Sequence, residues 1–266
     1  MHSALIQLIR DALSDTTTDV FLIEGEPPRI RRDGEVVVLH PGPISKDSMV
    51  GFWKEAGGDP SGHREMDLSW QMPDGHRLRV NLYRTLGRLA AVMRPIRSQV
   101  PGLAELGLPA PLMESWMQRR FGLILITGPT GSGKSTTVAA CLDWINRNMA
   151  RHVVTLEDPI EYLFENDRSF FSQREIRLDT DDFSNALRAA LRQSPDVLFL
   201  GEIRDPETAI TALHAAETGH LVISTLHSSS VVETIDRFTH LIESSSAGAL
   251  SLLASQLVGI VTQQLL

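Results

Sequence analysis

The sequence lacks the features that mark several classes of protein. It has a single cysteine, Cys141, among 266 residues. One cysteine excludes a disulfide within the chain and any zinc site that needs two or more cysteine ligands. A basic excess is also missing, because 25 Lys and Arg stand against 33 Asp and Glu, for a net charge of −8. A protein that binds nucleic acid along its whole surface normally has the opposite balance, so no nucleic-acid partner is expected.

Long apolar runs are missing too. The start of the chain carries polar and charged side chains throughout, without the basic and then apolar order of a secretory signal. Residues 250–266 are interrupted by serine, threonine and glutamine, so they fall short of the ~20 apolar residues that cross a bilayer. Hydrophobic residues make up 42% and charged residues 22%, which is the balance of a folded globular chain. We therefore expect a cytoplasmic protein without a membrane-spanning segment.

Residues 1–97 have the pattern of a small domain that mixes helices and strands. Apolar residues at helical spacing occupy residues 5–13, and the Asp33-Gly34 pair suits the tight turn of a hairpin. Ser45 is placed to cap a second helix. With three later extended runs, this pattern predicts an antiparallel sheet of about five strands flanked by helices.

The pattern of expected elements changes after residues 98–111. These residues are rich in proline and glycine and are expected to form a linker. From residue 112 to 266, apolar strands alternate with helical stretches, which predicts a mostly parallel sheet covered on both faces. The expected strands are 122–127, 152–156, 196–200 and 221–226, and the expected helices are 134–148, 183–193, 206–217 and 246–264.

A phosphate-binding loop is the clearest motif. Residues 121–135 contain an apolar strand, a glycine-rich loop and a helix start, and they satisfy G-x-x-x-x-G-K-[ST] in that context. The glycines let successive backbone N–H groups point at a triphosphate, and the helix dipole favours the same anion. Lys134 is expected to neutralise the β and γ oxygens, and Ser135 to hold Mg²⁺. The expected nucleotide-binding residues are Gly128, Pro129, Thr130, Gly131, Ser132, Gly133, Lys134, Ser135 and Thr136.

Carboxylates follow two other apolar strands. Hydrolysis requires a metal anchor and a group that orients water, in addition to the loop. Glu202 follows one strand, where Gly201 occupies the place of the usual metal-anchoring aspartate. Glu157 and Asp158 end a second strand, with Glu161 shortly after. These acids are candidates because ligand sites lie at the carboxyl ends of parallel strands, although an acid at a strand end is also commonly a solvated loop residue.

Four segments in one order resemble a known family. Residues 128–135, 155–161, 191–205 and 215–227 are similar to the Walker A, Asp box, Walker B and His box of the ATPase superfamily of type II/IV secretion and type IV pili. The N-terminal part is similar to the PilT-like retraction ATPases of twitching motility. The resemblance implies a RecA-like ATPase domain, a smaller PAS-like α+β domain ahead of it, and binding of ATP and Mg²⁺.

The resemblance also implies partners and residue roles. It points to a homohexamer at the inner face of the cytoplasmic membrane, working on an inner-membrane pilus platform protein and alongside other pilus ATPases. The family usually continues beyond residue 266 with C-terminal helices, which are expected to be missing here. The implied catalytic set is Glu202, Glu157, Glu161, His227 and His220, with Arg79 and Arg94 as phosphate-directed arginines from the small domain. Ser135, Glu202 and Asp158 would hold Mg²⁺.

Several alternatives remain open at this point. The two arginines could instead be edge-strand charges that keep the sheet soluble. Which of Glu157 and Glu161 faces the water is not decided by the sequence. Retraction of a pilus is the expected work, and pilus assembly or type II/IV secretion is the alternative with the same chemistry. A nucleotide-gated regulatory subunit with little turnover is the alternative from a different class.

Overall fold

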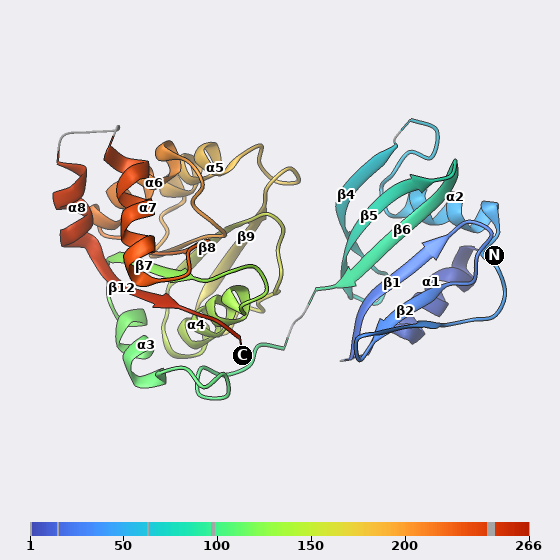
Figure 1. Cartoon of the computed structure of the whole chain (residues 1–266), viewed down its shortest axis with the longest axis horizontal. Coiled ribbons are helices and arrows are strands. Elements are labelled where there is room, and N and C mark those ends of the chain that lie inside the picture. Colours follow the sequence, from blue (N-terminus) through green and yellow to red (C-terminus); the bar gives the residue numbers. More distant parts are fainter. Residues whose placement is uncertain (1, 15, 63, 97–98, 244–247, 266) are drawn as a thin grey trace. The chain divides into compact units, whose positions relative to one another are not determined.

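The computed structural model describes residues 2–265 except 15, 63, 97–98 and 244–247. The chain divides into two compact units, Met1–Ile96 and Arg97–Leu266 (Figure 1). Each unit has a hydrophobic core of its own. Residues 97 and 98, where the predicted small domain ends and the predicted linker begins, lie outside the described residues. In the part of the chain that is described, no helix is long and apolar enough to cross a membrane.

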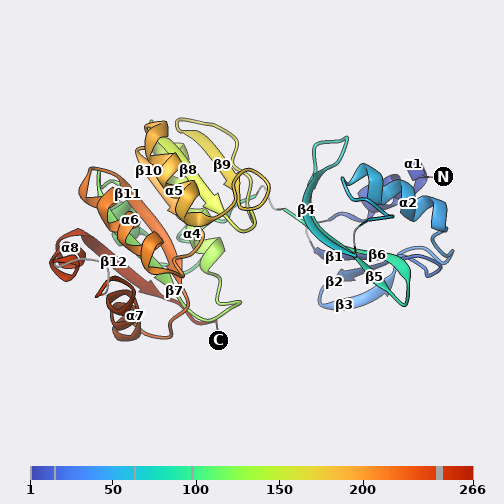
Figure 2. The same ribbon diagram turned by 90° about the horizontal axis from the view of Figure 1, so that it is seen from above.

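The N-terminal unit is an antiparallel sheet with two helices on one face (Figure 2). The strand order is β3-β2-β1-β6-β5-β4, so the sheet has six strands rather than the expected five or so. Its elements are α1 (His2–Ala12), β1 (Thr17–Ile23), β2 (Arg29–Arg32), β3 (Glu35–Val38), α2 (Lys46–Glu55), β4 (Glu65–Gln71), β5 (Arg77–Thr85) and β6 (Arg88–Pro95).

Local sequence explains the turns of this unit. Asp33 and Gly34 both have positive φ, 51° and 85°, which confirms the hairpin turn predicted there. The backbone N–H of Ser48 donates to Ser45 Oγ at 3.2 Å, which confirms the cap of α2. Alternate residues of β5 are buried, so one face packs against the helices while Arg79 points to the other.

The C-terminal unit is a six-stranded parallel sheet with helices on both faces. The strand order is β12-β7-β11-β10-β8-β9. Helices α3 and α4 share a core with one face, and α5 to α8 share a core with the other. Its elements are α3 (Ala110–Met117), β7 (Gly122–Thr127), α4 (Lys134–Asn148), β8 (His152–Glu157), β9 (Phe170–Glu175), α5 (Phe183–Ala190), the 3₁₀ turn η1 (Leu191–Gln193), β10 (Val197–Leu200), α6 (Pro206–Glu217), β11 (Leu221–Leu226), α7 (Val231–Glu243), α8 (Ala249–Gln256) and β12 (Leu257–Thr262).

The expected helix over 246–264 is wrong in its second half. Residues 246 and 247 lie outside the described residues, α8 ends at Gln256, and β12 then pairs parallel with β7. Valine, isoleucine and threonine favour a strand here. Gly259 lets the Trp116 ring pack closely against this strand, since a Cβ at that position would meet the ring at 2.4 Å. The apolar spacing is compatible with a helix, but the free edge of β7 decides in favour of a strand. The sequence pattern also did not predict β9, α7 or α3, which begins within the last two residues of the expected linker.

Candidate functional site

The candidate residues gather at the carboxyl edge of the parallel sheet. Strands β7, β11, β10 and β8 are in register, so their last residues end at the same edge. Gly128 follows β7, His227 follows β11, Glu202 comes two residues after β10, and Glu157 ends β8. Open α/β sheets bind ligands at this edge, so topology alone brings together four segments that are far apart in the sequence.

The loop between β7 and α4 has the backbone geometry of a phosphate cradle. Gly128, Gly131 and Gly133 have φ values of 150°, 80° and 87°, which other residues adopt only with strain. A Cβ on Gly128 would lie 2.3 Å from the backbone oxygen of Gln263, so only glycine fits there. Gly133 is the N-cap of α4, which aims the positive end of the helix dipole at the loop.

Several side chains of the loop fit an incoming phosphate. Ser132 Oγ is buried and makes no hydrogen bond to any described residue. Pro129 and Thr130 are exposed at the turn of the loop, and Ser135 is half-buried in the first turn of α4. Thr136 Oγ1 lies 3.1 Å from Tyr162 Oη, so this expected binding residue is held by the neighbouring loop.

Lys134 is folded onto its own loop. Its Nζ donates to the backbone oxygens of Gly128 and Pro129, both at 2.9 Å. Burial lowers the pKa of Lys134, while the negative charges of Glu202 and Glu161 act in the opposite direction. A phosphate oxygen can replace the two carbonyl acceptors, so the ammonium is already where the P-loop motif requires it.

Glu202 is paired with two basic side chains. Arg204 Nη2 forms an ion pair with Glu202 Oε1, and His227 Nε2 lies 3.7 Å from Glu202 Oε2. Burial and the nearby charge of Lys134 lower the pKa of His227 despite Glu202, so its ring is neutral at pH 7. Sequence reasoning did not assign Arg204, although its place two residues after Glu202 in Gly-Glu-Ile-Arg-Asp was a usable signal.

Glu157 is a buried acid at the end of β8. Thr155 Oγ1 donates to Glu157 Oε1 at 2.7 Å, and Gln173 Nε2 donates to the same oxygen at 3.4 Å. Burial raises the pKa of Glu157 to about 7, although these hydrogen bonds act in the opposite direction. A carboxyl with this pKa exchanges its proton in the neutral range, which is a property that proton-transfer residues share.

The raised pKa of Glu157 predicts a pH dependence of folding stability. Since the folded state holds this proton more tightly than the unfolded chain, the free energy of unfolding falls as pH rises from 4.5 to about 7. The loss amounts to about 3 kcal/mol at most. Glu157→Gln keeps an acceptor for Thr155 and removes the titration. Urea unfolding at pH 5.5 and pH 8 should therefore show a steeper decline for the wild type than for this variant.

A matched control is available for this prediction. Glu165 is an exposed acid on the loop between β8 and β9, and Glu165→Gln should follow the wild-type decline. Parallel declines for the wild type and Glu157→Gln would contradict the assignment of the titration to Glu157.

The other two acids of this segment differ in their surroundings. Asp158 Oδ2 is paired with Arg177 Nη2 at 3.1 Å, so this expected Mg²⁺ ligand is engaged by an arginine that sequence reasoning did not consider. Glu161 is exposed, and its charge reaches Lys134. The structure thus brings Glu161 and Glu202 toward the loop lysine.

The oxygen donors fit a Mg²⁺ ion that is held mainly by phosphates. No cluster of three or more His, Cys, Asp or Glu side chains in the described ranges is arranged to hold a metal. Mg²⁺ normally takes one or two protein oxygens together with substrate phosphates and water. Ser135 and Glu202, whose carboxylate pairs here with Arg204, are the residues at this edge of the sheet that would supply such oxygens.

His220 lies away from the loop. It directly precedes β11, whereas His227 directly follows that strand, and a rise of ~3.3 Å per residue separates the two by roughly 20 Å. His220 Nδ1 lies 2.9 Å from the backbone oxygen of Ala215, at the end of α6. Within this chain, the structure therefore does not bring His220 together with the loop, and its visible role is to close the turn between α6 and β11.

Arg79 and Arg94 lie opposite each other on β5 and β6 of the N-terminal unit. Both are exposed on the face of the sheet that the helices leave uncovered. Arg94 Nη2 pairs with Asp19 Oδ1 at 2.8 Å. Burial would raise the pKa of Asp19, but its bonds to Arg94 and Thr18 and the charge of Arg31 hold that pKa below its usual value. Arg94 therefore has a partner within its own unit.

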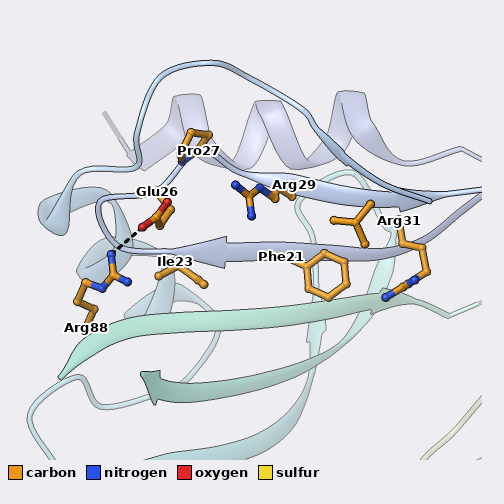
Figure 3. A pocket seen from close by; sticks show the side chains of 8 residues that line it. Phe21, Ile23, Glu26, Pro27, Arg29, Arg31 and Arg88 are labelled. Carbon is orange, nitrogen blue, oxygen red and sulfur yellow. Dashed lines mark hydrogen bonds and ion pairs between the residues drawn. The ribbon is translucent and has the colours of Figure 1, made fainter. Parts of the chain in front are cut away.

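A separate hollow of ≈ 420 Å³ lies on the same uncovered face (Figure 3). Phe21 and Ile23 form part of its floor, and Arg88 pairs with Glu26 at its rim at 3.1 Å. The Arg31 guanidinium lies 5.7 Å from the centre of the Phe21 ring. Neither Arg79 nor Arg94 is among the described residues that line this hollow. The hollow is therefore distinct from the phosphate contact predicted for this unit.

A glycine cradle, a loop lysine and a neighbouring acid at the carboxyl edge of a parallel sheet define a P-loop nucleotide-binding protein. A family model described as "Type II/IV secretion system protein" matches residues 65–266. The chain belongs to this family.

Individual relatives extend the match to both units. The chain is 38% identical to the "Type IV pilus retractation ATPase PilT" of Pseudomonas aeruginosa, across 98% of this chain and 78% of that protein. It is 37% identical to the "Twitching motility protein" of Neisseria gonorrhoeae, across 99% of this chain and 72% of that protein. A crystal structure of the pilus retraction motor PilT with bound ADP superimposes with a TM-score of 0.90 at 39% identity, covering 98% and 78% of the two chains.

These likenesses settle the class of the protein. They confirm the predicted α/β class with a RecA-like P-loop domain, and they identify the chain as an ATPase. Nucleotide binding, predicted from the loop, is supported by the ADP bound to the related structure.

Proposed function

We propose that this protein is a motor that couples ATP hydrolysis to retraction of a type IV pilus. The observation that carries the proposal is the likeness to a pilus retraction ATPase over 98% of the chain, which includes the N-terminal unit as well as the ATPase unit. A likeness confined to the ATPase unit would fit any member of the family equally well.

The chemistry follows from the carboxyl edge of the sheet. The loop N–H groups and Lys134 bind the phosphates, and Glu202 orients the attacking water and accepts hydrogen bonds from it. His227, with its neutral ring beside Glu202, donates to or accepts from the same water. Ser135 and Glu202 would hold Mg²⁺, which supplies charge neutralisation between the phosphates when bound.

The remaining roles extend this proposal. Glu157, with a pKa of about 7, is the Asp-box acid best suited to exchange a proton, while Glu161 acts on Lys134 through its charge. Arg79 and Arg94 act on the phosphates of a bound nucleotide, which their planar guanidinium groups suit. Arg94 must exchange Asp19 for a phosphate to do so.

The proposed assembly is a homohexamer at the cytoplasmic face of the inner membrane. Its partner there is the pilus platform protein, and other pilus ATPases work beside it. The resemblance of the sequence to retraction ATPases supports these partners.

Deleting the gene tests the direction of work. Because retraction removes fibre, the deletion strain is expected to carry more and longer surface pili and to lose twitching, which electron microscopy and a motility assay measure. Complementation with the wild type should restore both, whereas the Glu202→Gln variant should restore neither. Bald cells would assign the protein to pilus assembly instead, and unchanged pili would overturn a pilus role.

A further inference from the structure

Gln263 continues the pairing of two strands up to the phosphate loop. It directly follows β12, and its backbone N–H donates to the oxygen of Thr127 at 2.8 Å. Thr127 is the last residue of β7 and precedes the first glycine of the loop. In Figure 1, β12 is the red strand that runs beside β7. The segment that enters the loop is therefore fixed by a hydrogen bond from Gln263.

The side chain of the same residue reaches the segment that leaves the loop. Gln263 Nε2 donates to Thr137 Oγ1 at 2.7 Å. Thr137 is a buried residue in the first turn of α4, where its own N–H donates to the backbone oxygen of Gly133 at 3.0 Å. One glutamine thus bonds both the strand before the loop and the helix after it.

Two further observations indicate that Gln263 serves the geometry of the loop and does not only fill space in the core. Its backbone oxygen lies so close to Gly128 that any side chain there would collide with it. Its Oε1 and the loop hydroxyl Ser132 Oγ are both buried without a hydrogen-bond partner among the described residues. Buried polar atoms are normally paired, and unpaired ones concentrate at sites whose geometry serves a function.

We propose that Gln263 is a positioning residue for ATP hydrolysis, which sets the distance between β7 and the first turn of α4. Lys134 and Ser135 lie in that first turn, so a shift of α4 relative to β7 displaces both from the phosphates. Displacements of about 1 Å cost on the order of 100-fold in rate in other enzymes. Gln263 itself touches neither the phosphates nor the water in this scheme.

The test is steady-state ATP hydrolysis by the full chain with Gln263→Met. Methionine preserves the volume and the backbone bond to Thr127, and it removes the side-chain bond to Thr137 together with the unpaired Oε1. We expect kcat to fall by about tenfold while KM for ATP changes less than about threefold, because a shift of about 1 Å misaligns Lys134 and Ser135 for the transition state but leaves Lys134 close enough to hold the ground-state phosphates. Gln264→Ala is the control, since Gln264 is the exposed neighbour of the same type, and its kcat should match the wild type.

A second variant keeps the proposal testable if Gln263→Met folds poorly. Thr137→Val removes the acceptor of the same hydrogen bond and should lower kcat to a similar extent. Combining the two changes should lower kcat no further, because both remove one interaction. A kcat within twofold of the wild type in either single variant, or additive losses in the double variant, would overturn the positioning role.

Amide hydrogen exchange separates this proposal from the proposed function on which its kinetic test rests. Loss of the bond should speed exchange at residues 137–140, at the end of the first turn and in the second turn of α4, with Gln264→Ala unchanged. A wild type without ATP turnover would contradict the proposed function, and faster exchange would still support the role of Gln263. Unaltered exchange in both Gln263→Met and Thr137→Val would overturn that role whatever the turnover.

Discussion

Replacing Lys134 with alanine is expected to abolish detectable binding of ATP and ADP. The ammonium is buried among the loop carbonyls of Gly128 and Pro129, and it offsets the nearby charges of Glu202 and Glu161. Without it, an incoming phosphate meets two carbonyl oxygens and the charges of Glu202 and Glu161 with no ammonium in the loop. Hydrogen bonds to charged groups contribute about 1.5–3 kcal/mol each. Loss of the lysine should therefore weaken binding by roughly 100-fold or more.

Isothermal titration calorimetry with ADP measures this effect directly. Lys54→Ala is the matched control, since Lys54 is exposed in the last turn of α2 in the other unit. Its affinity for ADP should equal that of the wild type. The melting temperature of Lys134→Ala without nucleotide should stay close to the wild-type value, which separates lost binding from lost folding. Retention of submicromolar ADP binding by Lys134→Ala would contradict the assignment of the phosphate loop.

The change Glu202→Gln is expected to preserve nucleotide binding and to lower turnover by about 100- to 10,000-fold. Glutamine keeps the shape of the side chain but loses the negative charge that holds a proton of the attacking water. General acid–base groups contribute rate factors of about 10² to 10⁴. The charge also holds Arg204 and faces His227, so the variant should free the guanidinium and remove the acidic neighbour of the ring.

A phosphate-release assay and an ADP titration on the same preparation test this prediction. Glu217→Gln is the control, because Glu217 is an exposed acid at the end of α6, far along the chain from the loop. The kcat of that control should equal the wild-type value. Undiminished turnover in Glu202→Gln would remove Glu202 from the mechanism and move the water-orienting role to Glu157 or Glu161. Loss of ADP binding would instead make Glu202 a binding residue.

The candidate site was predictable from the sequence wherever one short segment carries both the chemistry and the backbone geometry. The loop of residues 128–135 is such a segment, because its glycines, its lysine and its helix start are adjacent in the chain. Glu202 was predictable as well, since it follows an apolar strand whose end must lie at the same edge of a parallel sheet. His227 entered only through the resemblance of its segment to the His box.

Pairings between distant side chains were not predictable. Arg177 with Asp158 and Gln263 with Thr137 both depend on side-chain directions at the ends of neighbouring elements. His220 shows the same dependence on the fold, because its motif neighbours suggested a site role while β11 carries it to the opposite edge of the sheet within this chain. A motif lists residues in order and does not state at which end of a strand each one stands.

The sequence by itself determined the class of the protein, because a phosphate loop, its flanking elements and the strand and helix alternation are local properties of the chain. Only the tertiary structure decided that residues 257–262 form a strand, since their apolar spacing is compatible with a helix until the unpaired edge of β7 is available. It likewise decided the raised pKa of Glu157, because burial depends on what the rest of the chain packs over that carboxyl. Chemistry that resides in one segment can be deduced from the sequence, whereas chemistry that depends on neighbours across the sheet requires the fold.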